Sequence, residues 1–406
     1  MSEWKECTIG ELGKIITGKT PRTAFTENYG GNIPFLSPSD NMDIKYVGDT
    51  NKTLSEQGVR EVKNCLLPEG AVCVSCIGSD LGKVLITTQP TVTNQQINSI
   101  IVNDENDVDF VYYLMTIVGK RLNIISKTST AVPIINKSSF SNHKITLPNL
   151  ETQKKIADIL SSLDEKIETK RKINARLEEL AQAIFKSWFI DFEPFGGKMP
   201  VDWGYIAISD FPHEIETGKR PKGGVSGITV GIPSIGAESI KGIGYYDYSK
   251  TKYIPYKYAE SMKKGRIKDF DLLIYKDGGK PGYFIPDFSM MGLGFPFDEM
   301  FLNEHVFRLN LGKPELNIFA YFFFKTDEVM NYLNSVGGKA AIPGINQKNV
   351  EDVEILDLDI PQIHKFGEII LPMFKNILEN SKESARLAAL RDTLLPKLMS
   401  GEIKIQ

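Results

Sequence analysis

The sequence contains few cysteines and no long hydrophobic run. Its four cysteines (Cys7, Cys65, Cys73 and Cys76) all lie near the start of the 406-residue chain. A disulfide framework would join both halves of so long a chain, so we expect reduced thiols. A membrane helix needs about 18 consecutive apolar residues, and a signal peptide needs a basic and then an apolar segment. Because neither pattern is found, we expect a cytoplasmic chain that makes no membrane contact.

The sequence also lacks an overall excess of basic residues. Lys and Arg number 48 against 51 Asp and Glu, for a net charge of -3, whereas a domain that binds nucleic acid is usually basic. The charge is unevenly distributed, since residues 250–268 carry seven basic residues and one acid. Tyr253, Tyr256 and Tyr258 lie in the same stretch, and nucleic-acid surfaces combine cations with planar rings. The alternative is a solvated charged loop beside a tyrosine-rich core.

A complete catalytic constellation is missing. Residues 13–20 (GKIITGKT) match the phosphate-binding pattern GxxxxGK[ST], but Pro21 biases Thr20 away from the helix that a nucleotide loop needs. The sequence CVSC at 73–76 would need further ligands to bind a metal, because strand residues three apart point to opposite faces. We find no aminomethylation motif, glycine-rich cofactor fingerprint or nuclease cluster. A non-catalytic chain is therefore favoured over a P-loop enzyme.

The second half of the chain repeats the first. The hexapeptide TGKTPR at 17–22 returns as TGKRPK at 217–222, an offset of 200 residues. After a short insertion the offset becomes 210, because AVPIIN at 131–136 matches AIPGIN at 341–346. Colinear matches of this kind indicate two copies of one unit. Each copy begins with turn-rich stretches of β-branched and aromatic residues, which predict short strands, and ends with a long predicted helix.

Both predicted helices carry an apolar heptad repeat. A helix over 153–189 would be about 55 Å long, more than a small domain needs. We expect the two helices to pair as an antiparallel coiled coil. Lys170 interrupts the first seam, Asn376, Asn380 and Glu383 interrupt the second, and Pro372 is expected to kink the start of the second helix. The predicted interface consists of Ile156, Ile159, Leu163, Ile173, Leu177, Leu180 and Ile184 in the first helix, and Phe366, Ile369, Met373, Leu387, Leu390 and Leu394 in the second. The alternative is that each helix packs on its own domain.

Basic side chains in both copies are the predicted DNA contacts. The turn that both copies share, Thr-Gly-Lys-x-Pro-basic, would present cations to a DNA backbone. The predicted DNA-binding residues are Thr17, Lys19, Arg22 and Lys83 in the first copy, and Lys219, Arg220, Lys222, Lys252, Lys257, Lys263, Lys264, Arg266 and Lys280 in the second. A tandem pair of readers at a fixed spacing is suited to a bipartite DNA site.

Several stretches resemble the specificity subunits of Type I restriction-modification enzymes. Those similar to the conserved helical regions of the family are LPNLETQKKI (147–156), WFIDFEPF (188–195) and LRDTLLPKLMSGEI (390–403). Those similar to its recognition domains are IGSDLGKV (77–84) and NQQI (94–97). The second copy departs from this pattern, with NEHV at 303–306.

The resemblance covers the whole chain and implies an α+β fold. It implies two tandem target-recognition domains, each a mixed β-sheet with helices followed by a long helix, and an antiparallel coiled coil of the two helices with pseudo-two-fold symmetry. The expected divisions are recognition domain 1 (1–150), helical spacer 1 (151–190), a linker (191–200), recognition domain 2 (201–355) and helical spacer 2 (356–406).

The resemblance also implies a non-catalytic subunit that reads an asymmetric bipartite site in double-stranded DNA. Two modification subunits would dock on the chain, and restriction or translocase subunits would join them. S-adenosylmethionine, ATP and Mg²⁺ would be bound by those partners, with no cofactor or metal in this chain. The alternative from another class is a coiled-coil scaffold that does not bind DNA.

Overall fold

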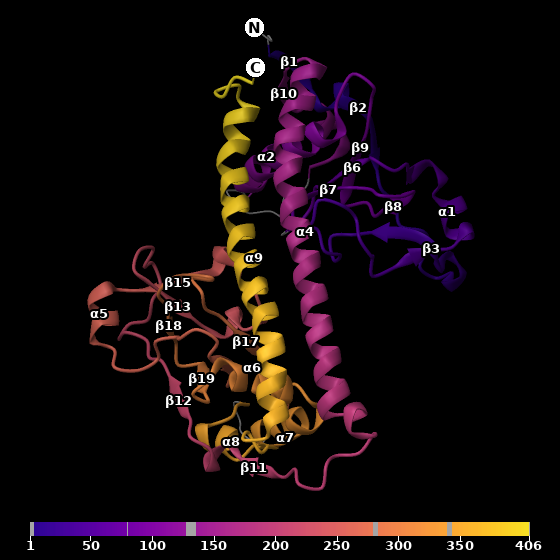
Figure 1. The fold of residues 1–406 in the computed structure, drawn as a ribbon. Helices are drawn as coiled ribbons and strands as arrows, with labels where there is room; N and C mark the ends of the chain where they lie inside the picture. The colour runs from indigo at the N-terminus through magenta and orange to yellow at the C-terminus, as the bar shows by residue number, and fades with distance from the viewer. Residues whose placement is uncertain (1–3, 79, 127–134, 279–282, 339–342, 406) are drawn as a thin grey trace. The chain divides into compact units, whose positions relative to one another are not determined.

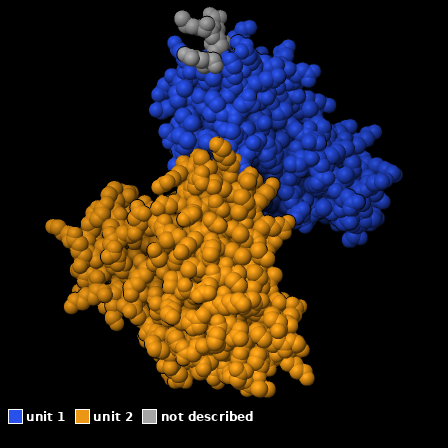
Figure 2. Space-filling view, viewed as in Figure 1, with its two compact units in different colours: residues 1–165, 388–406 blue, residues 166–387 orange. Residues whose placement is uncertain are grey.

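The structure is a computed structural model that describes residues 4–78, 80–126, 135–278, 283–338 and 343–405. The chain divides into two compact units (Figures 1 and 2), unit 1 with residues 1–165 and 388–406, and unit 2 with residues 166–387. The division crosses both long helices. Each unit therefore contains a part of each helix.

The described part of unit 1 contains three small sheets. Its strands are β1 (Lys5–Thr8), β2 (Gly13–Thr17), β3 (Tyr29–Leu36), β4 (Thr53–Leu54), β5 (Leu66–Leu67), β6 (Val72–Ser75), β7 (Val84–Ile86), β8 (Thr91–Thr93), β9 (Ile97–Val102) and β10 (Lys144–Leu147). One sheet has the order β2-β9-β6-β7 with antiparallel pairs, and another has the order β4-β3-β8-β5 with β3 parallel to β8. The third is the antiparallel pair β1-β10.

Helices cover these sheets and complete the core of unit 1. They are α1 (Glu56–Glu61), α2 (Val108–Ser126), α3 (Lys137–Ser141), the first part of α4 (Leu150–Phe189) and the last part of α9 (Pro361–Met399). Helix α2 packs against β6 and β7. Its buried Phe110 and Tyr113 share one core with Leu160 of α4 and Leu395 and Leu398 of α9. The sheets of unit 1, the first part of α4 and the last part of α9 are therefore held by the same apolar contacts.

Unit 2 repeats this arrangement. Its described strands are β11 (Tyr205–Ala207), β12 (Glu214–Thr217), β13 (Ile232–Ile235), β14 (Gly242–Ile243), β15 (Lys252–Ile254), β16 (Leu272–Tyr275), β17 (Phe288–Met290), β18 (Phe301–Leu302), β19 (Val306–Asn310) and β20 (Glu354–Leu356). The sheets β12-β19-β16-β17-β14, β15-β13-β18 and β11-β20 correspond to those of unit 1. As in unit 1, one pair in the smaller sheet, β13 with β18, is parallel. The duplication seen in the sequence is thus a duplication of topology.

Aromatic side chains fill the core of unit 2. Its helices are α5 (Tyr256–Ser261), α6 (Pro314–Phe324), α7 (Asp327–Gly337), α8 (Gln347–Glu351) and the remaining parts of α4 and α9. Helix α6 packs against β16 and β17. On α4, Phe185 and Phe189 lie with ring centroids 5.7 and 5.0 Å from Phe319 of α6, and Phe366 of α9 lies 5.4 Å from Phe189. Such ring clusters bury large apolar areas, so both long helices are anchored in this core.

Within each unit, α4 and α9 run antiparallel. In unit 1, Arg391 donates a hydrogen bond to Asp164 at 2.5 Å. In unit 2, Lys170 pairs with Glu383 at 2.5 Å, and the Asn174 side chain donates to the hydroxyl of Ser381 at 3.1 Å. Lys170 and Glu383, which interrupt the two predicted seams, are therefore partners of each other. Helix α9 continues through Pro372.

The buried faces of the two helices differ from the prediction at one heptad position. At the first position Ile156, Leu163 and Phe366 are buried, and Leu177, Ile184, Met373, Leu387 and Leu394 are half-buried. At the second position the predicted side chains are 37% to 49% exposed, namely Ile159, Ile173, Leu180, Ile369 and Leu390. After Ile159, Leu180 and Ile369 the next residue is buried instead, namely Leu160, Ala181 and Ile370. After Ile173 and Leu390 the next residue is half-buried. Both helices pack against the cores of the two units as well as against each other. The buried side chain at the second heptad position is therefore the next residue along the helix.

Two further sequence features have a clear structural outcome. Residues Gly13–Thr17 of the phosphate-loop pattern form β2, and Lys19 and Thr20 lie in the turn that follows it, not at a helix start. This geometry does not suit a nucleotide loop, which needs a helix beginning at the lysine. Among the described residues, none of the helices combines the length and apolarity of a membrane span.

Candidate DNA-recognition surfaces

In unit 1 the basic turn that follows β2 is fixed to the neighbouring strands. The Thr17 hydroxyl donates to Asn98 Oδ1 at 2.6 Å, and the Lys19 backbone N–H donates to the Thr93 carbonyl at 2.9 Å. The Lys19 side chain is exposed. The Thr17 hydrogen bond therefore holds the start of the turn on the neighbouring strand, and the Lys19 side chain is available to a ligand.

Lys137 is a basic residue of this surface that the sequence analysis missed. Burial raises the pKa of the Cys65 thiol, and the positive charges of Lys19 and Lys137 partly oppose that effect. Both lysines therefore lie near Cys65. Asn136 accepts a hydrogen bond from the Ser139 N–H at 2.8 Å and so caps the helix that Lys137 begins. Its position one residue after the repeated AVPIIN segment could have indicated it.

The other predicted cations of unit 1 have acidic partners. Arg22 pairs with Glu61 at 2.7 Å. Lys83 pairs with Asp43 and Asp80 at 3.1 and 2.8 Å. It lines a hollow of about 580 Å³ with Tyr112 of α2, Asp164 of α4 and Arg391 of α9. Lys83 thus stands beside the long helices, a different setting from that of Lys19.

In unit 2 two basic turns pack together through glycines. Gly265 has a φ of +86°, and a Cβ there would lie 2.8 Å from the Cα of Gly218. A larger residue cannot be accommodated at that distance, so only glycine allows the backbones to approach. The contact brings the turn at 217–222 beside the turn at 263–266. Basic residues from distant parts of the sequence consequently share one surface.

A hollow of about 670 Å³ lies at this junction. Its lining includes Thr217, Lys219, Lys263, Lys264 and Gln347. The three lysines are exposed and form no ion pair with any described residue. Gln347 occupies the position that Lys137 has in the first copy, at the repeat offset of 210. This hollow therefore presents to a ligand three lysines that pair with no described acid.

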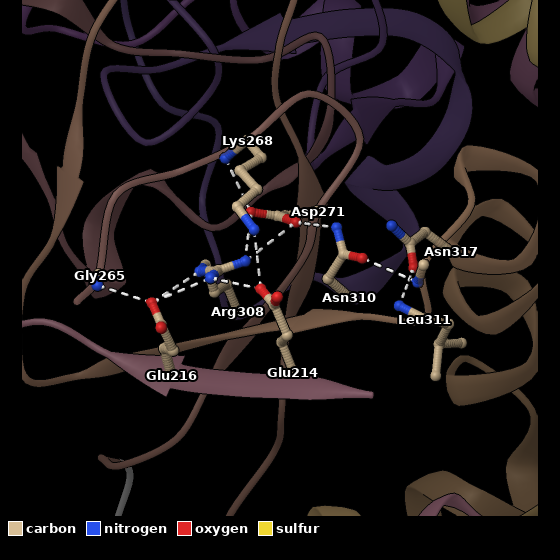
Figure 3. A network of polar contacts seen from close by, with 10 residues as sticks. Glu214, Glu216, Gly265, Lys268, Asp271, Arg308, Asn310, Leu311 and Asn317 are labelled. Carbon is tan, nitrogen blue, oxygen red and sulfur yellow. Dashed lines mark hydrogen bonds and ion pairs between the residues drawn. The ribbon is translucent and has the colours of Figure 1, made fainter. Parts of the chain in front are cut away.

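An ionic network around a buried arginine supports the basic turn (Figure 3). Arg308 of β19 is 3% exposed and lies between Glu214 and Glu216 of β12 and Asp271, at 3.0, 3.0 and 3.3 Å. Glu216 also accepts a hydrogen bond from the Gly265 N–H at 2.9 Å. Arg308 thereby fixes the carboxylate that holds the turn at 263–266.

The network shifts the ionisation of its carboxylates in opposite directions. Hydrogen bonds from Lys268 and Arg308 lower the pKa of Glu214. Burial raises the pKa of Asp271, although Asn310 donates to it at 2.7 Å and so favours the charged form. A carboxylate that is costly to bury depends on its ion-pair partner, so this cluster has a structural role that requires Arg308.

The remaining predicted cations of unit 2 fall into three groups. Arg220, Lys252 and Arg266 have acidic partners, Glu304 at 3.0 Å, Glu238 at 2.5 Å and Glu299 at 3.2 Å. Lys222 and Lys257 are exposed and form no ion pair with a described residue. Lys280 lies outside the described residues.

The CVSC segment is part of the unit 1 core. Cys73 and Cys76 are buried, and burial raises their thiol pKa values to about 12 and about 11. Ser99 and Asn98 donate hydrogen bonds to the two sulfurs at 3.3 Å each. Each sulfur therefore has its own neutral partner and stays a thiol at neutral pH.

The structure is a duplicated α+β unit with exposed basic turns, a combination that suits a protein that binds nucleic acid. Residues 1–179 match the Type I restriction modification DNA specificity domain. The MjaIX specificity subunit of Methanocaldococcus jannaschii is 28% identical, over all of this chain and 94% of its own length. The HindI specificity subunit of Haemophilus influenzae is 24% identical over 99% of this chain and 100% of its own length.

A solved structure shares the fold. The S subunit of a Type I restriction-modification system from M. genitalium superposes with a TM-score of 0.60 at 16% identity, covering 98% of this chain and 96% of that one. Along its whole length the chain is similar to specificity subunits of Type I restriction enzymes, and the match to the DNA specificity domain lies in its first part.

Proposed function

We propose that this chain is the specificity subunit of a Type I restriction-modification enzyme and reads an asymmetric bipartite site in double-stranded DNA. Residues 1–150 and 201–355 would each read one half-site, with 151–190 and 356–406 as helical spacers and 191–200 as the linker. The observation that carries the proposal is the recurrence of one fold with the same basic turn at its edge, at Lys19 and at Lys219. Because the two units differ in their other side chains, the two half-sites would differ.

The predicted phosphate contacts are the unpaired cations. Lys19 in unit 1 and Lys219, Lys263 and Lys264 in unit 2 are exposed and form no ion pair with a described residue. Lysines of this kind bind phosphate by releasing counterions, without reading the sequence. They would position each unit on the duplex, and neighbouring polar side chains would contact the bases.

The chain would act with catalytic partners in the cytoplasm and not catalyse a reaction itself. Two modification subunits would dock on it and restriction or translocase subunits would join, bringing S-adenosylmethionine, ATP and Mg²⁺ chemistry. The apolar side chains of Ile159, Ile173 and Leu180 on α4 and Ile369 and Leu390 on α9 are exposed. Exposed apolar side chains in register on long helices suit a protein interface.

The test is selection from a library of random duplexes by the full-length chain together with its modification subunits. The expected product is a site with two different specified segments separated by an unspecified spacer. Methylome sequencing of a host with and without the gene should give the same bipartite motif. Selection of one continuous segment would contradict the proposal of a bipartite site, and the absence of any preference would favour a scaffold without DNA specificity.

A further inference from the structure

A short turn in unit 1 lies beside the basic turn and carries three amide side chains. It joins β8 to β9 through Asn94, Gln95 and Gln96. The Asn94 N–H donates to the Leu36 carbonyl at 2.9 Å, and Asn94 Oδ1 accepts from the Gln96 N–H at 3.0 Å. Asn94 is buried and Gln95 is exposed. The asparagine thus builds the turn, and the glutamine after it faces outward.

Unit 2 builds the same turn with different residues after the asparagine, and these are half-buried. Asn303, Glu304 and His305 join β18 to β19. The Asn303 N–H donates to the Ile235 carbonyl at 2.9 Å, and Asn303 Oδ1 accepts from the His305 N–H at 2.8 Å. The equivalent asparagines make equivalent bonds, so Gln95 and Glu304 occupy the same place in the fold.

The middle residue of each turn contacts the basic turn at the same position. In unit 1 the Thr20 hydroxyl donates to Gln95 Oε1 at 2.7 Å. In unit 2 Arg220 pairs with Glu304 Oε1 at 3.0 Å. Thr20 and Arg220 are themselves equivalent, as the fourth residues of TGKT and TGKR. One structural position therefore carries a neutral pair in unit 1 and a charged pair in unit 2.

We propose that these two pairs, Thr20 with Gln95 and Arg220 with Glu304, are specificity-determining contacts to DNA bases. The inference rests on the proposed function, and it assigns the base contacts that the function leaves open. The two units share the backbone and the lysine of the basic turn around these pairs. That shared part suits contact with phosphate, because the DNA backbone is the same whatever the base sequence. Side chains that differ on a shared scaffold are the ones that can make two half-sites different.

The chemistry of the pairs indicates which bases they prefer. An amide side chain can bond twice to the N6 and N7 of adenine, and a threonine methyl can contact thymine. Arginine bonds twice to O6 and N7 of guanine, and a carboxylate accepts from N4 of cytosine. The unit 1 pair therefore suits an A·T pair. The unit 2 pair suits a G·C pair, with guanine as the base for Arg220 and cytosine as the base for Glu304.

The test exchanges the pairs in the full-length chain, again with its modification subunits and a library of random duplexes. R220T/E304Q gives unit 2 the side chains of unit 1, and T20R/Q95E makes the reciprocal change. A bidentate base contact discriminates by about tenfold or more. In each variant the ratio of binding to the preferred base over the other bases should change by about this factor, at one or two adjacent positions of one half-site. The other half-site should stay as it is in the unmodified chain.

A matched control makes the same substitutions on α4. Arg176 and Glu179 form an exposed pair at 2.6 Å, so R176T/E179Q should leave both half-sites unchanged. If R220T/E304Q fails to fold, E304Q alone keeps the carboxylate volume and should still lose preference at one position of its half-site.

Two results would overturn the inference while leaving the proposed function intact. One is an unchanged preference in both exchange variants. The other is weaker binding to all duplexes with the same preferred site, which would assign the pairs a phosphate or structural role. An unmodified chain that selects no site at all would instead refute the proposed function, so the two failures are distinguishable.

Discussion

Some basic side chains of this protein form an ion pair with an acidic side chain, and others form none with a described residue. Lys219, Lys263 and Lys264 line one hollow without an ion pair to any described residue, whereas Arg220 and Arg266 are paired with Glu304 and Glu299. A paired cation must give up or share its acid when it meets phosphate, which offsets part of the gain. The unpaired lysines should therefore dominate the nonspecific part of DNA binding.

The triple variant K219A/K263A/K264A tests this expectation. We expect weaker binding to all duplexes, with an unchanged preferred site. The slope of log affinity against log salt should fall by about 0.9 for each phosphate that the variant no longer neutralises. The control K313A/K365A/K375A removes three exposed lysines outside this hollow. Filter binding at several salt concentrations would measure both variants, and equal losses of affinity in the two would count against a local phosphate site.

Arg308 has a structural part in the same surface. It is buried among three carboxylates, one of which holds the Gly265 N–H. Removing the arginine takes the ion-pair partner from the buried Asp271 carboxylate, whereas removing a whole buried ion cluster can be nearly neutral. The network therefore makes unit 2 dependent on a single side chain.

R308M should lower the free energy of unfolding of unit 2 by about 3–5 kcal/mol. Adding E214Q, E216Q and D271N to R308M should recover much of that loss, because the unpaired charges are gone. R176M, at an exposed arginine of α4, should change stability by about 0.5 kcal/mol or less. Urea unfolding compares the three, and an R308M loss as small as that of R176M would contradict the assignment.

At the scale of elements, the sequence predicted the long helices well and their buried faces less well. Apolar periodicity located α4 and α9, and the repeat offset showed that they are equivalent. Ile159 and Leu160 are adjacent and both apolar, so spacings of three and four residues fit either as the second seam position. The structure buries Leu160 because α4 must also face α2 and the sheets of unit 1.

Adjacent alanine variants distinguish the two positions. L160A should lower stability by about 2–5 kcal/mol because it leaves a cavity in the unit 1 core. I159A should cost under about 1 kcal/mol, since that side chain is 37% exposed. Thermal and urea unfolding of the two variants provide the comparison. Similar losses at both positions would restore the heptad face predicted from sequence.

The sequence predicted most of the basic residues that belong to the candidate site, but not which acidic residues they contact. The repeated TGKxP turn drew attention to Lys19 and Lys219 from the sequence alone. The acids that pair with Arg220 and Arg266 come from other strands and loops, and Lys137 reaches Cys65 only through the fold. Periodicity and local spacing carry no information about such long-range partners. Which cations are free could therefore be learned only from the structure.

For the whole molecule, the decisive feature is that both long helices belong to both units. Unit 1 contains the Asp164 to Arg391 hydrogen bond, and unit 2 contains the Lys170 to Glu383 ion pair. The division between the units falls between these contacts on each helix. A change of helix length at the division would leave the contacts within each unit intact.

This feature allows a direct test of the proposal that the helices set the spacing of the half-sites. One heptad inserted after Glu165 and another after Leu387 keep the antiparallel register on both sides. Seven helical residues rise about 10 Å and a base pair about 3.4 Å, so the spacer should lengthen by up to about 3 base pairs. Each half-site should be retained, as measured by selection from random duplexes. The same seven residues inserted between the exposed Gly196 and Gly197 should leave the spacer unchanged. A spacer that ignores the helical insertion, or responds equally to the loop insertion, would show that the helices do not determine the spacing.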